Sequence, residues 1–256
     1  MLKRACLLFV ALSCAVFAAD LGTAENPLII DDENDLVLLR NAVNAGSGTF
    51  KGVDVSNGAT DLHFKLGRDL NLSNVCGKDI GSWTPIGTTE HPFKGNFDGN
   101  DKTIDYLFIY EDMPARGDTA IGIYGLFGVL ATEFTSTTEI KNLTIGENSS
   151  VVSMRDGQVG SVIGNAGFNV IVSNCKNKGY VSGRNVVGGI VGFAGNVALP
   201  DGVRIKNCVN EGHVDASLKA GGIVGAVNGF GVHIDSCKNL GSVSAADTAA
   251  GIVASI

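Results

Sequence analysis

The 256-residue sequence is poor in several features that define common protein classes. It has five prolines, four histidines and 7% aromatic residues, and only 18% of its residues are charged. Its 45% hydrophobic content excludes a wholly disordered chain. The scarcity of aromatics beside 35 glycines argues against a compact helical bundle, and the missing three-residue glycine period excludes collagen. With a net charge of −7, the chain offers no basic stripe for a nucleic-acid partner.

A sustained apolar run occurs only at the N-terminus. Lys3 and Arg4 precede the apolar residues 5–17, and small residues around Ala18 suit a cleavage site. A run of roughly 13 residues is too short to cross a bilayer, and the layout is typical of a secretory signal peptide. We therefore expect residues 1–18 to be removed, no transmembrane segment to remain, and the protein to be secreted or held at the cell surface.

Export makes two kinds of surface motif relevant. Three Asn-x-Ser/Thr sequons mark Asn71, Asn142 and Asn148 as candidate N-glycosylation sites of a glycoprotein, provided that the source glycosylates exported chains. The tripeptide Arg116, Gly117, Asp118 stands in a polar segment that we expect to protrude as a loop. Because it presents opposite charges at its two ends, it is a candidate adhesion element for integrin-type receptors.

The most informative pattern is an internal repeat. Segments 172–181, 205–214 and 234–243 share an aliphatic residue, Asn or Ser, Cys, Asn, Gly and Val in one order, and a Gly-Ile-Val block follows each. A weaker copy begins at residue 140. Each copy holds three short β-favouring pieces separated by Gly and Asn, which tolerate the left-handed backbone of tight corners. The repeat therefore predicts one coil of a parallel β-helix per copy, with three strands and three corners.

The repeated polar and sulfur positions should stack from coil to coil. Matched asparagines can bond the coils above and below through their amides. Cys175, Cys208 and Cys237 should form a structural ladder, either as small buried thiols or with one disulfide between adjacent coils. With no CxxC pair and no neighbouring histidines, the cysteines predict no metal site. The sequence predicts no cofactor.

The first half of the chain is less regular but fits the same plan. Residues 35–44 predict a short amphipathic helix after an acidic start, suited to cover the open end of a solenoid. Residues 64–72 alternate like a strand, and residues 99–101 predict a turn. We expect a single domain over 19–256, with an N-terminal cap at 19–50, irregular coils at 51–139 and regular repeats at 140–256.

The order of several short blocks resembles secreted and cell-surface proteins that carry GLUG motifs. These blocks are Trp83–Gly87, Phe93–Asn100, Thr103–Leu107, the Gly-Leu-Phe-Gly of Gly125–Gly128, and Ile140–Leu143. The resemblance implies a right-handed parallel β-helix similar to the pectin-lyase-like architecture. It also implies repeats found in adhesin-like proteins and in non-catalytic regions of secreted peptidases that cleave immunoglobulin A. It carries over no catalytic residue.

The sequence is compatible with three functions. The first is a non-enzymatic surface protein that recognises a host, cell or glycan partner, because no nucleophile elbow, zinc helix or P-loop is present. The second is a polysaccharide-cleaving β-helix enzyme, which would need carboxylates, alone or with Arg or Lys, converging in one groove. The third is a spacer within a larger secreted protein.

Overall fold

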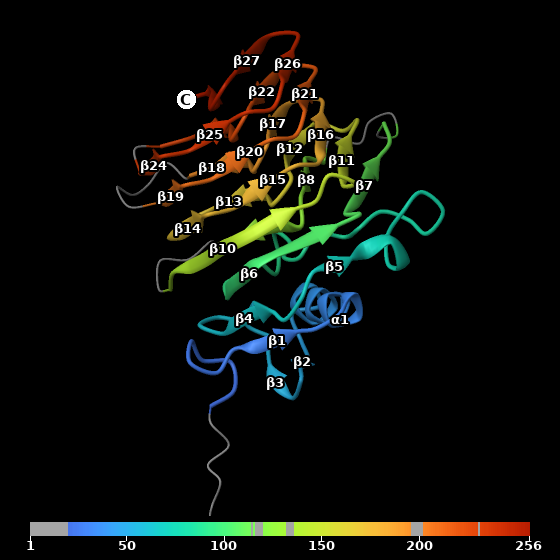
Figure 1. Cartoon of the computed structure of the whole chain (residues 1–256), viewed down its shortest axis with the longest axis vertical. Helices are drawn as coiled ribbons and strands as arrows, with labels where there is room; N and C mark the ends of the chain where they lie inside the picture. Colours follow the sequence, from blue (N-terminus) through green and yellow to red (C-terminus); the bar gives the residue numbers. More distant parts are fainter. Residues whose placement is uncertain (1–19, 114, 116–119, 132–135, 196–201, 230) are drawn as a thin grey trace, which may run out of the picture.

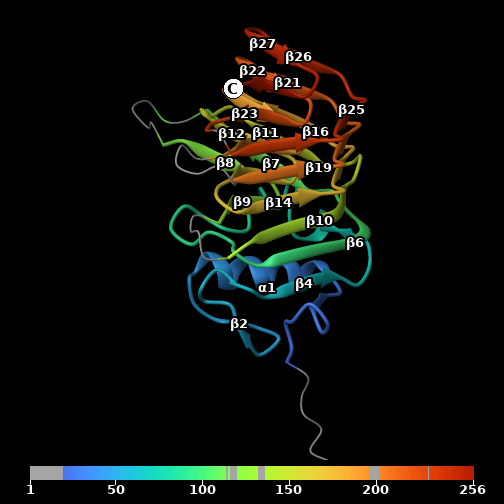
Figure 2. The same ribbon diagram turned by 90° about the vertical axis from the view of Figure 1, so that its left-hand side faces the viewer.

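In a computed structural model, the chain folds into a β-solenoid, in which successive coils of the backbone stack and pair through parallel strands (Figure 1). Each coil is called a turn of the solenoid below. The structure describes residues 20–113, 115, 120–131, 136–195, 202–229 and 231–256. Strands from distant parts of the sequence lie beside one another in the same direction, and the N-terminal segment and the C-terminus lie at opposite ends of the stack (Figures 1 and 2). The parallel β-helix predicted from the repeats is confirmed.

The largest sheet runs the whole length of the stack and has 11 strands. Its main path consists of β1 (Leu28–Ile30), β4 (His63–Leu66), β6 (Asn96–Asp105), β10 (Thr138–Ile145), β14 (Val170–Ser173), β19 (Val203–Lys206) and β24 (Val232–Asp235). Four two-residue strands extend it sideways: β5 (Leu70–Asn71), β15 (Lys176–Asn177), β20 (Val209–Asn210) and β25 (Lys238–Asn239).

Three further sheets of five strands each close the turns. One contains β7 (Phe108–Glu111), β11 (Ser150–Ser153), β16 (Tyr180–Gly183), β21 (Val214–Ala216) and β26 (Val243–Ala245). The next contains β8 (Gly122–Tyr124), β12 (Gly157–Gly160), β17 (Val186–Gly188), β22 (Lys219–Gly221) and β27 (Thr248–Ala250). The last contains β9 (Phe127–Leu130), β13 (Ile163–Ala166), β18 (Val191–Ala194), β23 (Val224–Val227) and β28 (Val253–Ser255).

The expectation of three strands per coil is wrong. A regular turn has five, for example β14 to β18. The sequence did not mark β15 and its equivalents because Lys-Asn lacks the β-branched and aromatic residues that favour strands. Pairing with the turns on both sides holds these two residues extended, as the register of Lys176 with Thr144 and Val209 shows.

Left-handed corners bend the turns at the repeated Asn or Ser that precedes Cys or, in the first copy, Leu143. Asn142, Asn174, Asn207 and Ser236 have φ between 51° and 55°. Asn tolerates this region better than most residues because its short polar side chain bonds locally. In β6 the same bend falls at residues 100 and 101, with φ of 52° and 57°. The turn expected at 99–101 is present as a bend, but it does not end the strand, because β6 pairs with β10 on both sides of it.

The one α-helix among the described residues, α1 (Glu33–Asn44), lies at the N-terminal end of the stack (Figures 1 and 2). Asp32 caps it by accepting a hydrogen bond from the Asp35 backbone nitrogen at 2.9 Å. Leu36, Leu39 and Val43 point into the core at helical spacing. The predicted capping helix is confirmed. A small antiparallel hairpin, β2 (Thr49–Phe50) and β3 (Val53–Asp54), and the short 3-10 helix η1 (Leu72–Asn74) complete this end.

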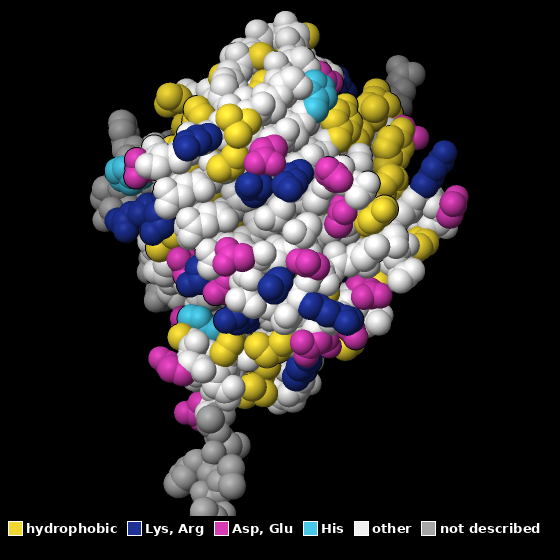
Figure 3. Space-filling model, viewed as in Figure 1, with side chains coloured by type: hydrophobic (Ala, Val, Ile, Leu, Met, Phe, Trp, Pro, Cys, Tyr) yellow, Lys and Arg dark blue, Asp and Glu magenta, His cyan; other side chains and the backbone are white. Residues whose placement is uncertain are grey.

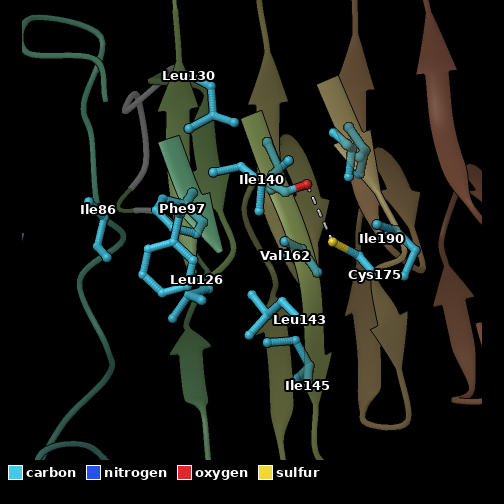
Figure 4. Packing of buried hydrophobic residues seen from close by; sticks show 14 of the residues in the cluster. Ile86, Phe97, Leu126, Leu130, Ile140, Leu143, Ile145, Val162, Cys175 and Ile190 are labelled. Atoms are coloured by element: carbon cyan, nitrogen blue, oxygen red, sulfur yellow. Dashed lines mark hydrogen bonds between the residues drawn. The ribbon is translucent and has the colours of Figure 1, made fainter. Parts of the chain in front are cut away.

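The core changes in character along the stack. Near the helix it is aromatic: the ring of Phe93 lies 5.9 Å from that of Phe64 and 5.2 Å from that of Phe127. Farther along it is built from aliphatic residues and small thiols, which Figure 4 shows around Ile140, Val162 and Cys175. No helix within the described ranges has the length and hydrophobicity that a membrane crossing requires.

Candidate functional site

The outward side of the long sheet carries two continuous rows of mostly polar side chains. Because strands alternate inward and outward residues, each buried core residue is flanked by two outward positions. The first row consists of His63, Asn96, Glu139, Ile171, Arg204 and His233. The second consists of Lys65, Asp98, Lys141, Ser173, Lys206 and Asp235. Figure 3 shows basic and acidic side chains interspersed over this face.

The second row alternates in charge at its N-terminal end. Lys65 is in register with Asp98, and Asp98 with Lys141. Opposite charges on directly opposed strand positions favour the pairing of the strands, whereas like charges would oppose it. The row therefore supports the stacking of β4, β6 and β10 while it also presents charge to solvent.

The first three strands of these rows form the floor of a hollow of about 240 Å³. The segment that carries Ala24, Glu25 and Pro27 is its wall. Six polar side chains from the two rows line it: His63, Lys65, Asn96, Asp98, Glu139 and Lys141. We call this hollow the sheet-face cleft.

Hydrogen bonds hold the polar groups of the cleft in place. Lys141 Nζ lies 2.7 Å from Glu139 Oε2. Asp98 Oδ1 accepts from the backbone nitrogen of Asn100 at 2.8 Å and from Asn142 Nδ2 at 2.9 Å, so this carboxylate fixes the strand bend. Asn96 Oδ1 accepts from the backbone nitrogen of Glu139 at 3.0 Å. Most of the polar side chains that line the cleft are therefore held in fixed positions by neighbouring groups.

This cleft was not identified from the sequence. Its residues come from segments separated by 33 and 43 positions, as the contacts of Asn96 with His63 and Glu139 show. A usable signal was present: three polar-apolar-polar triplets, at 63–65, 96–98 and 139–141, surround the buried residues Phe64, Phe97 and Ile140. Aligning these triplets as successive coils would have brought the two rows together.

A second surface feature is an exposed apolar strip over β7, β11 and β16, which Figure 3 shows as a group of hydrophobic side chains. Tyr110 is 47% exposed, Met154 41% and Tyr180 39%. The ring of Tyr180 stacks on that of His213 with centroids 5.5 Å apart, and His213 Nδ1 lies 2.6 Å from Ser242 Oγ. Exposed aromatic groups of this kind occur at recognition surfaces.

The three sequons have different surroundings. Asn71 and Asn148 are exposed, whereas Asn142 is half-buried. Asn142 donates to Asp98 and accepts from Asn174 Nδ2 at 2.9 Å, so its amide links three successive turns. The adhesion candidates Arg116, Gly117 and Asp118 lie outside the described residues, as does the expected signal peptide 1–18.

The structure places Cys175, Cys208 and Cys237 at matched positions of successive turns, each one residue before a paired strand. All three are free, and each Sγ donates to a carbonyl of the preceding turn, such as Cys175 to Ile140 at 3.7 Å (Figure 4). Hydrogen bonding with the Cys175 thiol, together with burial, raises the pKa of Cys208. Within the described part of the chain, no cluster of His, Cys, Asp or Glu could hold a metal ion.

A ladder of asparagines, buried at Asn177 and Asn210 and half-buried at Asn239, runs beside the cysteines. Asn177 Nδ2 donates to Asn210 Oδ1 at 2.8 Å, and Asn210 Nδ2 donates to Asn239 Oδ1 at 2.8 Å. Each of these amides also donates to the backbone carbonyl two residues ahead, at 2.9 to 3.1 Å. The amide bonds predicted between coils are present.

Comparison with known proteins gives distant relatives. A proposed Gly-rich membrane protein of Evansella cellulosilytica is 28% identical over 151 residues, 59% of this chain and 14% of that protein. Halomucin of Haloquadratum walsbyi is 31% identical over 60% of this chain and 2% of its own length. The chain therefore corresponds to a small part of either relative. No protein-family model matches it.

A solved structure shares the fold. The crystal structure of a proposed immunoglobulin A1 protease from Bacteroides ovatus superposes with a TM-score of 0.65 over 92% of this chain and 63% of that one, at 23% identity. At this identity the likeness shows the β-solenoid architecture and leaves activity open.

Proposed function

We propose that the protein is a secreted or surface-exposed, non-enzymatic recognition protein that binds a protein or glycan partner along the outer side of its long sheet. The observation that carries this proposal is the sheet-face cleft, in which side chains from three successive turns present fixed donors and acceptors. An extended stack suits recognition because each turn adds contacts in the same register.

Two further observations support export and a surface role. One of the relatives is a proposed membrane protein, and the blocks from residues 83 to 143 resemble GLUG-motif surface proteins. The expected leader at 1–18 would direct the chain out of the cell.

Binding of the tagged mature chain to intact cells, extracellular matrix and an array of glycans tests the proposal. Lys65→Ala and Lys141→Ala should weaken binding at least tenfold, because each removes a cationic donor from the cleft. Lys178→Ala is the matched control, since it removes an exposed lysine elsewhere on the solenoid. Equal binding by all three variants, or no binding to any surface, would contradict the proposal.

Polysaccharide cleavage is the second candidate, because Asp98 and Glu139 converge with Lys65 and Lys141 in one hollow. Release of reducing or unsaturated sugar ends from acidic polysaccharides, abolished by Glu139→Gln, would favour it. The existing bonds argue for binding instead: Asp98 is engaged by the strand bend and Glu139 by Lys141.

A further inference from the structure

Two of the three sequons converge on one exposed tyrosine, although they are far apart in the sequence. Asn148 lines a hollow of about 320 Å³ together with Ile80, Tyr106 and Phe108. Asn71 lines the neighbouring hollow, and Tyr106 belongs to both. The apolar hollow therefore has a glycosylation acceptor built into its rim.

Tyr106 is held in an unfavourable backbone conformation beside this acceptor. Its φ is 59°, in the left-handed region that bulky residues rarely adopt, and its side chain is 42% exposed. Asp105 Oδ1 fixes the bend by accepting from the backbone nitrogens of Tyr106 at 2.9 Å and Asn148 at 3.0 Å. A strained aromatic residue that stays on the surface needs a reason beyond core packing.

The geometry points to an N-linked glycan on Asn148 that packs against the side chain of Tyr106, whereas the sequon at Asn142 stays unglycosylated. The inference rests on export, which is part of the proposed function. The occupant of the apolar hollow is then the first N-acetylglucosamine of that glycan. The apolar face of such a sugar ring packs on an aromatic ring, which offers a large rigid surface.

The chemistry of the attachment leaves the local bonds intact. In the secretory compartment the donor is a lipid-linked oligosaccharide diphosphate. Nδ2 of Asn148 forms a bond to C1 of the first sugar, gives up one proton, and displaces the lipid diphosphate from C1. The second Nδ2 hydrogen remains available for the bond to Asp105 Oδ2, which is 2.8 Å long in the structure.

Asn142 offers no comparable freedom. Its amide is stacked between Asp98 and Asn174 of the adjacent turns, with both bonds 2.9 Å long. Its backbone takes the left-handed corner that the coil requires. The sequon at this position is a product of the repeat motif. Its amide is half-buried between two neighbouring turns, whereas that of Asn148 is exposed, so a glycan has less room at Asn142.

The test uses the full chain secreted from a eukaryotic host, with site occupancy measured by peptide mass spectrometry. We expect glycan on Asn148 and Asn71 and none on Asn142. Ser150→Ala removes the Asn148 sequon without touching Asn148, and Ser150→Thr is the matched control that retains it. The glycosylated Ser150→Thr protein should melt about 2–4 °C above Ser150→Ala.

A double-mutant cycle with Tyr106 separates the stabilisation due to packing of the glycan on the tyrosine ring from any other effect of the glycan on stability. The melting difference should vanish when Tyr106→Ala is added to both variants and persist with Tyr106→Phe. Glycan on Asn142, an unmodified Asn148 in the secreted chain, or an undiminished difference with Tyr106→Ala would overturn the inference. Since only secreted protein is measured, failure of binding to cells and failure of this inference give separate results.

Discussion

Replacing Asn210 in the middle of the asparagine ladder should destabilise the protein more than replacing the terminal Asn239. Asn210 is fully buried, accepts from Asn177 and donates to both Asn239 and the carbonyl of Gly212. Asn210→Ala therefore leaves a donor of Asn177 and the Gly212 carbonyl without partners in the core. Leaving a buried polar group unsatisfied costs about 1–3 kcal/mol, so two such groups predict a loss of about 2–6 kcal/mol.

Asn239→Ala is the matched control because it has the same residue type and the same repeat position. Asn239 accepts the ladder bond from Asn210 and donates to the Gly241 carbonyl, but both residues 239 and 241 are half-buried. Water can therefore replace part of what is lost, and its removal should cost about 1 kcal/mol. Urea unfolding followed by circular dichroism gives both free energies of unfolding. Equal losses for the two variants, or a loss below about 1 kcal/mol for Asn210→Ala, would show that the ladder does not stabilise the stack as described.

Three other substitutions test the core, the corner and the thiols. Phe97→Ala should cost about 3–5 kcal/mol in urea unfolding, because its buried ring packs 5.2 Å from that of Phe127, and a cost below 1 kcal/mol would contradict this packing. Asp98→Ala should destabilise more than Asp98→Asn, since the amide oxygen can still accept at the strand bend; equal effects would count against that role. The raised pKa of Cys208 keeps its thiol neutral in the folded protein, while the unfolded thiol ionises near pH 8.5. Its contribution to stability is therefore present below that pH and falls by about 1.4 kcal/mol per pH unit above it. In Cys208→Ala, the free energy of unfolding should fall less steeply between about pH 8.5 and 10 than in the unchanged protein. An unchanged slope would show that the Cys208 thiol is not the group responsible.

The repeat alone was enough to predict the solenoid, because it aligns the residues that stack. Asn177, Asn210 and Asn239 share one repeat position, and that position is one vertical column in the structure. The capping helix was also predictable, since Leu36, Leu39 and Val43 have helical spacing after an acidic start. Both predictions depend on local patterns that tertiary contacts reinforce.

Local sequence patterns could not predict the number of strands per turn or the sheet-face cleft. Strand β15 exists because neighbouring turns pair with it, and its own residues do not favour extended structure. The cleft requires the register between β4, β6 and β10, which the repeat does not reach because the coils before residue 140 vary in length. Cross-strand pairing therefore decides what the local sequence leaves open.

A distance measurement between spin labels at Lys65 and Asp235 tests the stacked register most directly. These two outward positions belong to one row, five strand steps apart along β4, β6, β10, β14, β19 and β24. With strands about 4.8 Å apart, we expect a narrow distribution at ~24 Å, to which the length of the labels is added. A broad distribution, or one centred beyond about 40 Å, would contradict the parallel stack on which the cleft and both proposals depend.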